Sequence, residues 1–315
     1  NKNHGMDAKR MIPIARLILP LLFIFFCSVA LHATERPWDH ITFTKPDDVV
    51  AYFHSINYSV ANWQQGDRSV PRVYLTHIPD HWRDHYAGAV STENKKKYFF
   101  FMLTPMVLRA NETIARQRAF VEAMQQTRAW AEQDRKHLQD IAAEYAVTAP
   151  QSAGDAAAFN TLLRRVDVVP ASLAMAQAAI ESGWGTSRFA SEGNALFGQW
   201  TWGDDAIAPQ RVRTELGNYG IRSFKTPFES IAAYMHNLNT HPAYEALRRM
   251  RAQARQQQQP LSGKALAAGL EKYSERGEAY VKEIRTLIRV NRLTEVDKAY
   301  LLSLIHISEP TRRDQ

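Results

Sequence analysis

The sequence predicts an α+β protein that is predominantly α. One long stretch, 120–146, consists of good helix formers without glycine or proline, and shorter segments of this kind follow it. Only 211–224 has the features of a short hairpin, with Gly217-Asn218-Tyr219-Gly220 as its turn. The 315 residues are 45% hydrophobic and 23% charged. That composition is typical of a globular chain with ample core, and it excludes disordered and collagen-like classes.

The order of the expected elements follows from where prolines, glycines and polar residues interrupt the chain. Residues 34–90 are of mixed character, with four prolines and one short candidate strand at 73–75. A loop is expected at 148–155, and a compact segment rich in alanine, glycine and tryptophan at 170–203. Helices are expected at 95–118, 120–146, 159–166, 229–238, 244–255 and 282–291.

The first 33 residues have the pattern of a secretory signal peptide. Lys9, Arg10 and Arg16 precede an apolar run at 17–30, and small residues then allow cleavage after Ala30 or Ala33. A membrane-spanning helix needs about 20 apolar residues, so an uncleaved anchor is the weaker alternative. We therefore expect export to the periplasm or beyond, with no stable membrane span after the signal is removed.

Charge and cysteine content narrow the possible partners and chemistry. The net charge is +7, but 1–33 contain four cations and one anion, which leaves the remainder only mildly basic. A balance this mild does not predict a nucleic-acid partner. The single cysteine, Cys27, lies in the apolar run, so the mature chain would have no disulfide, thiol nucleophile or cysteine-bound metal.

Glu181 is the strongest candidate for a catalytic side chain. Pro170 and Gly183 are typical start and stop signals around an alanine-rich helix, which we expect to be central and buried. Glu181 then falls in the last turn, where the helix dipole penalises a negative charge, and Ile180 and Trp184 add desolvation. Both effects raise the carboxyl pKa, as a general acid in glycoside hydrolysis requires. The alternative is a solvated glutamate at a frayed helix end.

A loop of aromatic residues follows this helix. Phe197, Trp200 and Trp202 occur among glycines in 193–203. Such side chains can stack on sugar rings, or they can simply belong to the core. The pattern leaves both interpretations open.

A longer signature resembles a known family. Ala176-Gln177-Ala178-Ala179-Ile180-Glu181-Ser182-Gly183-Trp184-Gly185, followed by Asn194-Ala195-Leu196-Phe197-Gly198, resembles glycoside hydrolase family 73, and more closely its Bax-type bacterial glucosaminidases. These enzymes cut peptidoglycan and have a lysozyme-like α+β fold. The resemblance covers about 160–292. It implies a hydrolase domain there, an N-terminal region at 34–159 that packs on it, and a tail at 293–315. Part of that tail, 304–312, resembles a translated sequencing adapter.

The resemblance also implies roles for individual residues. Glu181 would be the general acid. Thr214-Glu215 matches the context of the family's second carboxylate, with Asp204 and Asp205 as local alternatives. The stretch 274–277 departs from the family, since many members are shorter there. No metal or other cofactor is implied. Residues implied to bind substrate are Gln177, Trp184, Asn194, Phe197, Gly198, Trp200, Trp202, Tyr273 and Tyr280.

The function predicted from these observations is hydrolysis of β-1,4-glycosidic bonds of peptidoglycan at N-acetylglucosamine. Cleavage after N-acetylmuramic acid and a non-catalytic wall-binding role remain as alternatives. A metal site is a further alternative, since His81 and His85 would share a helix face beside Asp84 and near His77. The His-Glu-x-x-His pattern is absent, however, and Pro79 leaves room for only a short helix.

Overall fold

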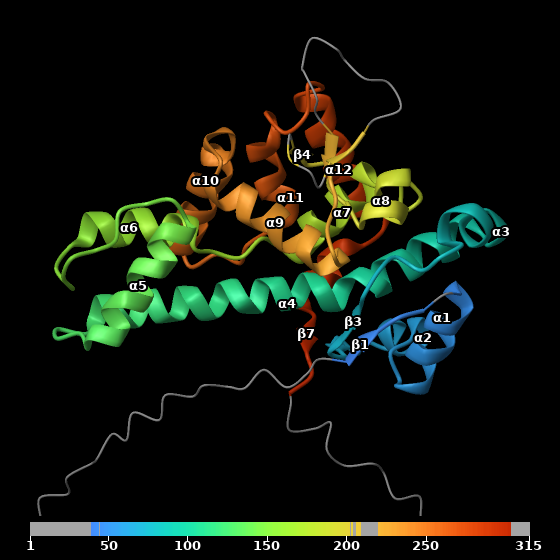
Figure 1. The fold of residues 1–315 in the computed structure, drawn as a ribbon, viewed down its shortest axis with the longest axis horizontal. Coiled ribbons are helices and arrows are strands. Elements are labelled where there is room, and N and C mark those ends of the chain that lie inside the picture. Colours follow the sequence, from blue (N-terminus) through green and yellow to red (C-terminus); the bar gives the residue numbers. More distant parts are fainter. Residues whose placement is uncertain (1–38, 44, 202, 204–205, 209–219, 304–315) are drawn as a thin grey trace, which may run out of the picture. The chain divides into compact units, whose positions relative to one another are not determined.

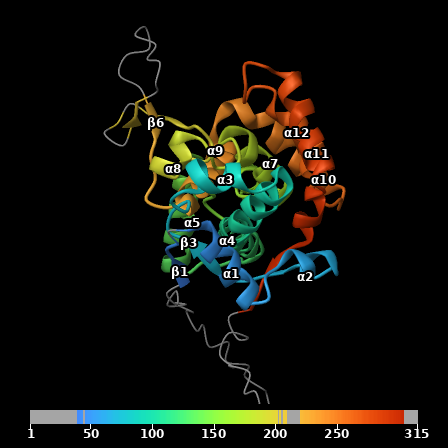
Figure 2. The same ribbon diagram turned by 90° about the vertical axis from the view of Figure 1, so that its right-hand side faces the viewer.

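A 35-residue helix, α4 (Thr92–Gln126), is the central element of the fold (Figure 1). The computed structural model describes residues 39–43, 45–201, 203, 206–208 and 220–303, all within one unit of the chain. In Figures 1 and 2, α4 lies between helices α1 (Pro46–Ser55) and α2 (Val60–Gln64) and the helices that follow residue 170. Among the described residues, none of the helices combines the length and apolar character needed to cross a membrane.

The structure describes short strands between longer helices. The α-helices are α1 (Pro46–Ser55), α2 (Val60–Gln64), α3 (Ala87–Ala89), α4, α5 (Glu132–Glu144), α6 (Ala156–Arg165), α7 (Ala171–Glu181), α8 (Arg188–Gly193), α9 (Pro227–Thr240), α10 (Glu245–Gln256), α11 (Gly263–Leu266) and α12 (Glu278–Val290). A π-helical turn η1 (Trp82–Tyr86) and 3-10 turns η3 (Pro242–Tyr244), η4 (Ala267–Leu270) and η5 (Leu293–Lys298) join them. The strands are β1 (Asp39–Ile41), β2 (Ser69–Val70), β3 (Val73–Leu75), β4 (Trp200–Thr201), β5 (Ala206–Ile207), β6 (Gly220–Arg222) and β7 (Tyr300–Leu301).

Helix α4 is longer than the sequence predicts and continues through a proline. Pro105 has no N–H, so the carbonyl of Phe101 loses its helical donor. The buried Tyr58 hydroxyl donates to that carbonyl at 3.3 Å, which replaces the missing hydrogen bond. The predicted helix at 120–146 is interrupted, because the chain turns after Gln126 and α5 begins only at Glu132. Neither glycine nor proline marks this turn, which the Trp130 indole stabilises by donating to the Met124 carbonyl at 2.9 Å.

Apolar side chains form two clusters along α4. The smaller cluster joins the C-terminal half of α4 to α5 and α6, through residues such as Val121, Ile141 and Phe159. The larger one surrounds α7, where every residue from Ala171 to Ala179 is buried. Alanine side chains let neighbouring elements approach α7 closely. A Cβ on Gly263 of α11 would lie 2.8 Å from the backbone nitrogen of Leu173.

The start of α7 is stabilised by a residue from the far end of the chain. The Asp297 carboxylate in η5 accepts hydrogen bonds from the Ser172 backbone N–H at 2.8 Å and from its hydroxyl at 2.7 Å. Burial raises the pKa of Asp297. Leu293 and Val296 are also buried, so the described part of 293–303 is folded onto the domain.

The main β element is an antiparallel sheet of three short strands, in the order β4-β6-β5. Trp200 pairs with Ile221, and Ile207 pairs with the same residue on the other side. The predicted hairpin at 211–224 is represented by β6, whose partners come from 200–207, while 209–219 lie outside the described residues. Two parallel pairs, β1-β3 and β2-β7, complete the strands, and β3 confirms the predicted strand at 73–75. The prediction of a predominantly α, α+β protein is confirmed.

Candidate active site

Glu181 is the last residue of α7, and its carboxyl group is partly buried. The Tyr280 hydroxyl on α12 donates to Glu181 Oε1 at 2.7 Å. Burial raises the pKa of the Glu181 carboxyl; the Tyr280 hydrogen bond opposes this rise, and the charge of Glu283 adds to it while that of Arg276 opposes it. Since burial is the largest effect, the carboxyl retains its proton to higher pH than a free glutamate does.

A chain of hydrogen bonds fixes the position of this carboxyl. Tyr234 on α9 donates to Gln177 Oε1 at 2.6 Å, and Gln177 Nε2 donates to the Tyr280 oxygen at 2.9 Å. Gln177 is fully buried one helical turn before Glu181. Because the Tyr280 oxygen accepts from Gln177, its own proton points to Glu181. Three helices therefore hold one oxygen of the carboxyl in place.

Other aromatic rings pack against the tyrosines of this hydrogen-bond chain. Phe197 and Tyr234 stack with centroids 3.8 Å apart, and Tyr273 and Tyr280 stack at 5.5 Å. Tyr244 lies 5.8 Å from Tyr273 by ring centroids. Burial raises the pKa of Tyr244 and of Tyr273, and the Glu181 charge raises both further, because an anion disfavours a second anion nearby.

Phe197 is only 3% exposed, and its ring stacks on that of Tyr234, so Phe197 packs in the core. The partly buried Tyr273 directs its hydroxyl to the Phe197 carbonyl at 3.4 Å.

Trp184 and Asn194 contact the N-terminal region of the chain. The Trp184 ring packs edge-on against Phe100 at 5.3 Å, and the Lys96 ammonium lies 4.9 Å from its centroid. Asn194 Oδ1 accepts from the Ile78 backbone N–H at 3.2 Å. The structure thus uses both side chains to join α7 and α8 to residues before 105.

Two further site candidates, Gly198 and Trp200, lie just before and on strand β4 of the three-stranded sheet. Gly198 has a positive φ of 59°, and no atom lies within 4 Å of where a Cβ would stand. Trp200 on β4 is 50% exposed, and it borders an open pocket of about 520 Å³ together with Arg222 and Asn237. Glu215, Trp202, Asp204 and Asp205 lie outside the described residues.

The structure adds residues that the sequence analysis did not select for the site. Tyr234 and Tyr244 fall in the helices expected at 229–238 and 244–255, and neither is among the predicted site residues. Helical spacing marks Tyr234 as buried, but no local signal shows that it faces Gln177.

The His81 and His85 rings are 4.9 Å apart at η1, and no group of three or more metal-ligating side chains occurs among the residues described.

Comparison with known proteins defines the class of this domain. Residues 156–293, which include Glu181 and Tyr280, match the glucosaminidase family, described as mannosyl-glycoprotein endo-beta-N-acetylglucosaminidase. The matched segment thus resembles a glucosaminidase domain, and its predominantly α, α+β structure is consistent with the lysozyme-like fold of that class.

Among individual proteins, Protein bax of Escherichia coli (strain K12) is 37% identical over 187 residues, or 59% of this chain and 66% of that protein. The chain therefore spans slightly less than two thirds of the relative that it matches. No solved structure gives a significant match. The comparisons support a Bax-like glucosaminidase-domain protein.

Proposed function

We propose that this protein is an exported peptidoglycan hydrolase that cleaves β-1,4 bonds at N-acetylglucosamine, with Glu181 as general acid. One observation carries the proposal: a partly buried carboxyl with a raised pKa ends the buried helix α7 and is held by Tyr280, within the segment that matches the glucosaminidase family. The signal-peptide pattern in 1–33 supports export.

The geometry around Glu181 suits proton delivery. Tyr280 occupies Oε1, and no hydrogen bond to Oε2 is found in the described part of the chain. Oε2 is thus the oxygen that can donate a proton to the leaving glycosidic oxygen. As the bond from that oxygen to the anomeric carbon breaks, positive charge develops on the sugar ring, and water then attacks the anomeric carbon.

Glu215 is proposed as the second carboxylate, which activates this water or stabilises the charged sugar. A carboxyl separation of about 5–5.5 Å would favour retention of configuration, and about 6.5–9.5 Å would favour inversion.

The exposed Trp200 supports a glycan-binding role for the pocket beside the sheet. Its ring offers a flat apolar face of the kind that stacks on sugars, and Arg222 and Asn237 supply polar groups. Asn237 also forms a hydrogen bond that lowers the pKa of Tyr244, one of the rings near Glu181. We propose that a glycan strand bound at Trp200 continues toward Glu181.

The experiment digests purified peptidoglycan with the mature protein, reduces the products with borohydride and identifies the reduced end sugar by mass spectrometry. Glu181→Gln is the test variant. Glu271→Gln is the matched control, because Glu271 is an exposed carboxylate of the same domain. Reduced N-acetylglucosamine from the parent and control, and none from Glu181→Gln, is the expected result. Reduced N-acetylmuramic acid would instead identify a muramidase, and no product from any protein would refute hydrolysis.

A further inference from the structure

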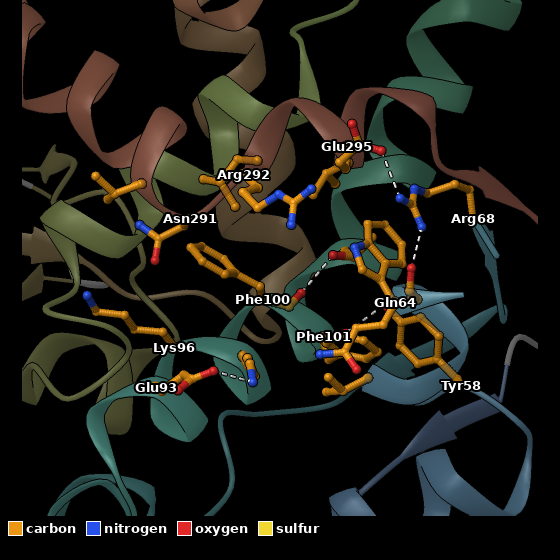
Figure 3. A pocket seen from close by; sticks show the side chains of 17 residues that line it. Tyr58, Gln64, Arg68, Glu93, Lys96, Phe100, Phe101, Asn291, Arg292 and Glu295 are labelled. Carbon is orange, nitrogen blue, oxygen red and sulfur yellow. Dashed lines mark hydrogen bonds and ion pairs between the residues drawn. The ribbon is translucent and has the colours of Figure 1, made fainter. Parts of the chain in front are cut away.

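A second pocket, of about 500 Å³, lies apart from the hydrogen-bonded group around Glu181 (Figure 3). Its walls come from α2, the first turns of α4, and the segment 290–296 at the end of α12 and in η5. Two of these three walls precede the family-matched segment 156–293. The pocket is therefore built where the N-terminal region meets the end of the hydrolase domain.

One side of this pocket is aromatic and held in place. The Tyr58 and Phe101 rings pack with centroids 4.6 Å apart, and Trp63 packs edge-on against Phe101 at 6.1 Å. Phe100 is 9% exposed and contacts Trp184 on its other side. A wall of this kind favours small apolar groups of a ligand, because burying them costs no rearrangement of the rings.

The charges around the pocket leave an excess of cations. Arg68 pairs with Glu295 at 2.7 Å and Lys97 with Glu93 at 2.5 Å, so these cations are neutralised locally. For Lys96 and Arg292, no carboxylate partner is found among the residues that the structure describes. Figure 3 shows these two side chains reaching the pocket from different elements, with Phe100 between them in this view. A partly enclosed site strengthens their attraction for an anion relative to open water.

The pocket also adjoins the turn that follows the catalytic helix. Lys96 and Phe100 line it, and both contact the ring of Trp184, three residues after Glu181. The Trp184 ring therefore joins the turn after Glu181 to the wall of this pocket.

We propose that this pocket binds a stem peptide of peptidoglycan, an inference that rests on the proposed function. Stem peptides have small apolar side chains, several carboxylates and, with a diamino acid, one ammonium group. The carboxylates would pair with Lys96 and Arg292, and the methyl groups would contact Phe100, Phe101 and Trp63. The ammonium group would lie beside Glu93, whose carboxylate it would share with Lys97. The enzyme would then prefer glycan that retains its peptides.

A binding experiment tests the site without any catalysis. The free tetrapeptide L-alanyl-γ-D-glutamyl-meso-diaminopimelyl-D-alanine is titrated into the parent protein, into Lys96→Gln/Arg292→Gln, and into Lys95→Gln/Arg289→Gln, by calorimetry. The control pair removes the same charge from α4 and α12 at residues that do not line the pocket. We expect binding by the parent and control, and a dissociation constant about tenfold or more higher for the test pair, since two charge-assisted hydrogen bonds are lost.

Absence of binding to the parent would overturn the proposal, and so would equal weakening in both variants or in neither. Circular dichroism melts establish that both variants are folded. A second readout is the ratio of cleavage rates for peptide-bearing and peptide-free glycan strands, which should fall several-fold in Lys96→Gln/Arg292→Gln only. If no protein cleaves either glycan, the proposed function fails, and the calorimetry still decides whether the pocket binds the peptide.

Discussion

Replacing Tyr280 by phenylalanine removes a single oxygen atom that has two partners. That oxygen donates to Glu181 Oε1 and accepts from Gln177 Nε2, and the Tyr280 side chain is 2% exposed. In Tyr280→Phe, the Gln177 amide is buried without an acceptor, which costs about 1–3 kcal/mol of unfolding free energy. The ring stacking on Tyr273 is retained, because the aromatic ring is unchanged.

The same substitution changes the titration of Glu181. The Tyr280 hydrogen bond lowers the pKa of Glu181, so its loss raises that pKa further. A general acid must be protonated to act, hence the alkaline limb of the kcat/KM profile should move to higher pH. The fall in kcat should remain below the roughly 10²–10⁴-fold contribution of the acid itself, since only its orientation is lost.

The assay combines urea unfolding with a pH profile of peptidoglycan cleavage. Tyr273→Phe is the matched control, because its hydroxyl has only a 3.4 Å contact with the Phe197 carbonyl. Tyr273→Phe should leave the alkaline limb unmoved. An unchanged limb together with an unchanged unfolding free energy in Tyr280→Phe would refute the role assigned to the hydrogen-bond chain.

Three further substitutions test neighbouring parts of the structure. Glu283→Gln removes a charge that raises the pKa of Glu181, so the alkaline limb of the rate profile should move to lower pH. Glu181→Gln should gain stability relative to the parent as pH rises. The pKa of Glu181 is higher in the folded than in the unfolded protein, so its stabilising contribution is complete below the unfolded-state pKa and is lost as pH rises through the folded-state pKa. Urea unfolding at pH 4 and pH 8 measures this difference. Asp297→Ala removes both acceptors of Ser172 at the start of α7 and should cost about 0.5–2 kcal/mol in urea unfolding.

Controls separate these effects from general ones. Glu271→Gln changes an exposed carboxylate and should reproduce neither the rate shift nor the stability trend. Asp297→Asn keeps one acceptor oxygen and should recover part of the stability lost in Asp297→Ala. A limb that moves upward in Glu283→Gln, a stability difference for Glu181→Gln that is the same at both pH values, or full stability of Asp297→Ala would each contradict the reasoning.

Helix positions were predictable from local signals in the chain. The helices expected at 229–238, 244–255 and 282–291 appear as α9, α10 and α12 with bounds shifted by four residues at most. Glu181 is at the end of α7 as expected, because proline and glycine act on the backbone beside them. The turn between α4 and α5 was missed, since it depends on a hydrogen bond from Trp130 and not on a helix-breaking residue.

The surroundings of Glu181 were only partly predictable. Burial of the carboxyl and the direction of its pKa shift followed from the last turn of an apolar helix. By contrast, only the tertiary structure brings Tyr234 and Tyr280 to Gln177 and turns Trp184 toward Lys96. Helix signals depend on backbone geometry within a few residues, whereas these contacts join residues 57 to 103 positions apart and depend on how whole helices pack. The sequence alone thus selected Glu181 as the candidate acid, and the packing of α7, α9 and α12 decided what holds its carboxyl group.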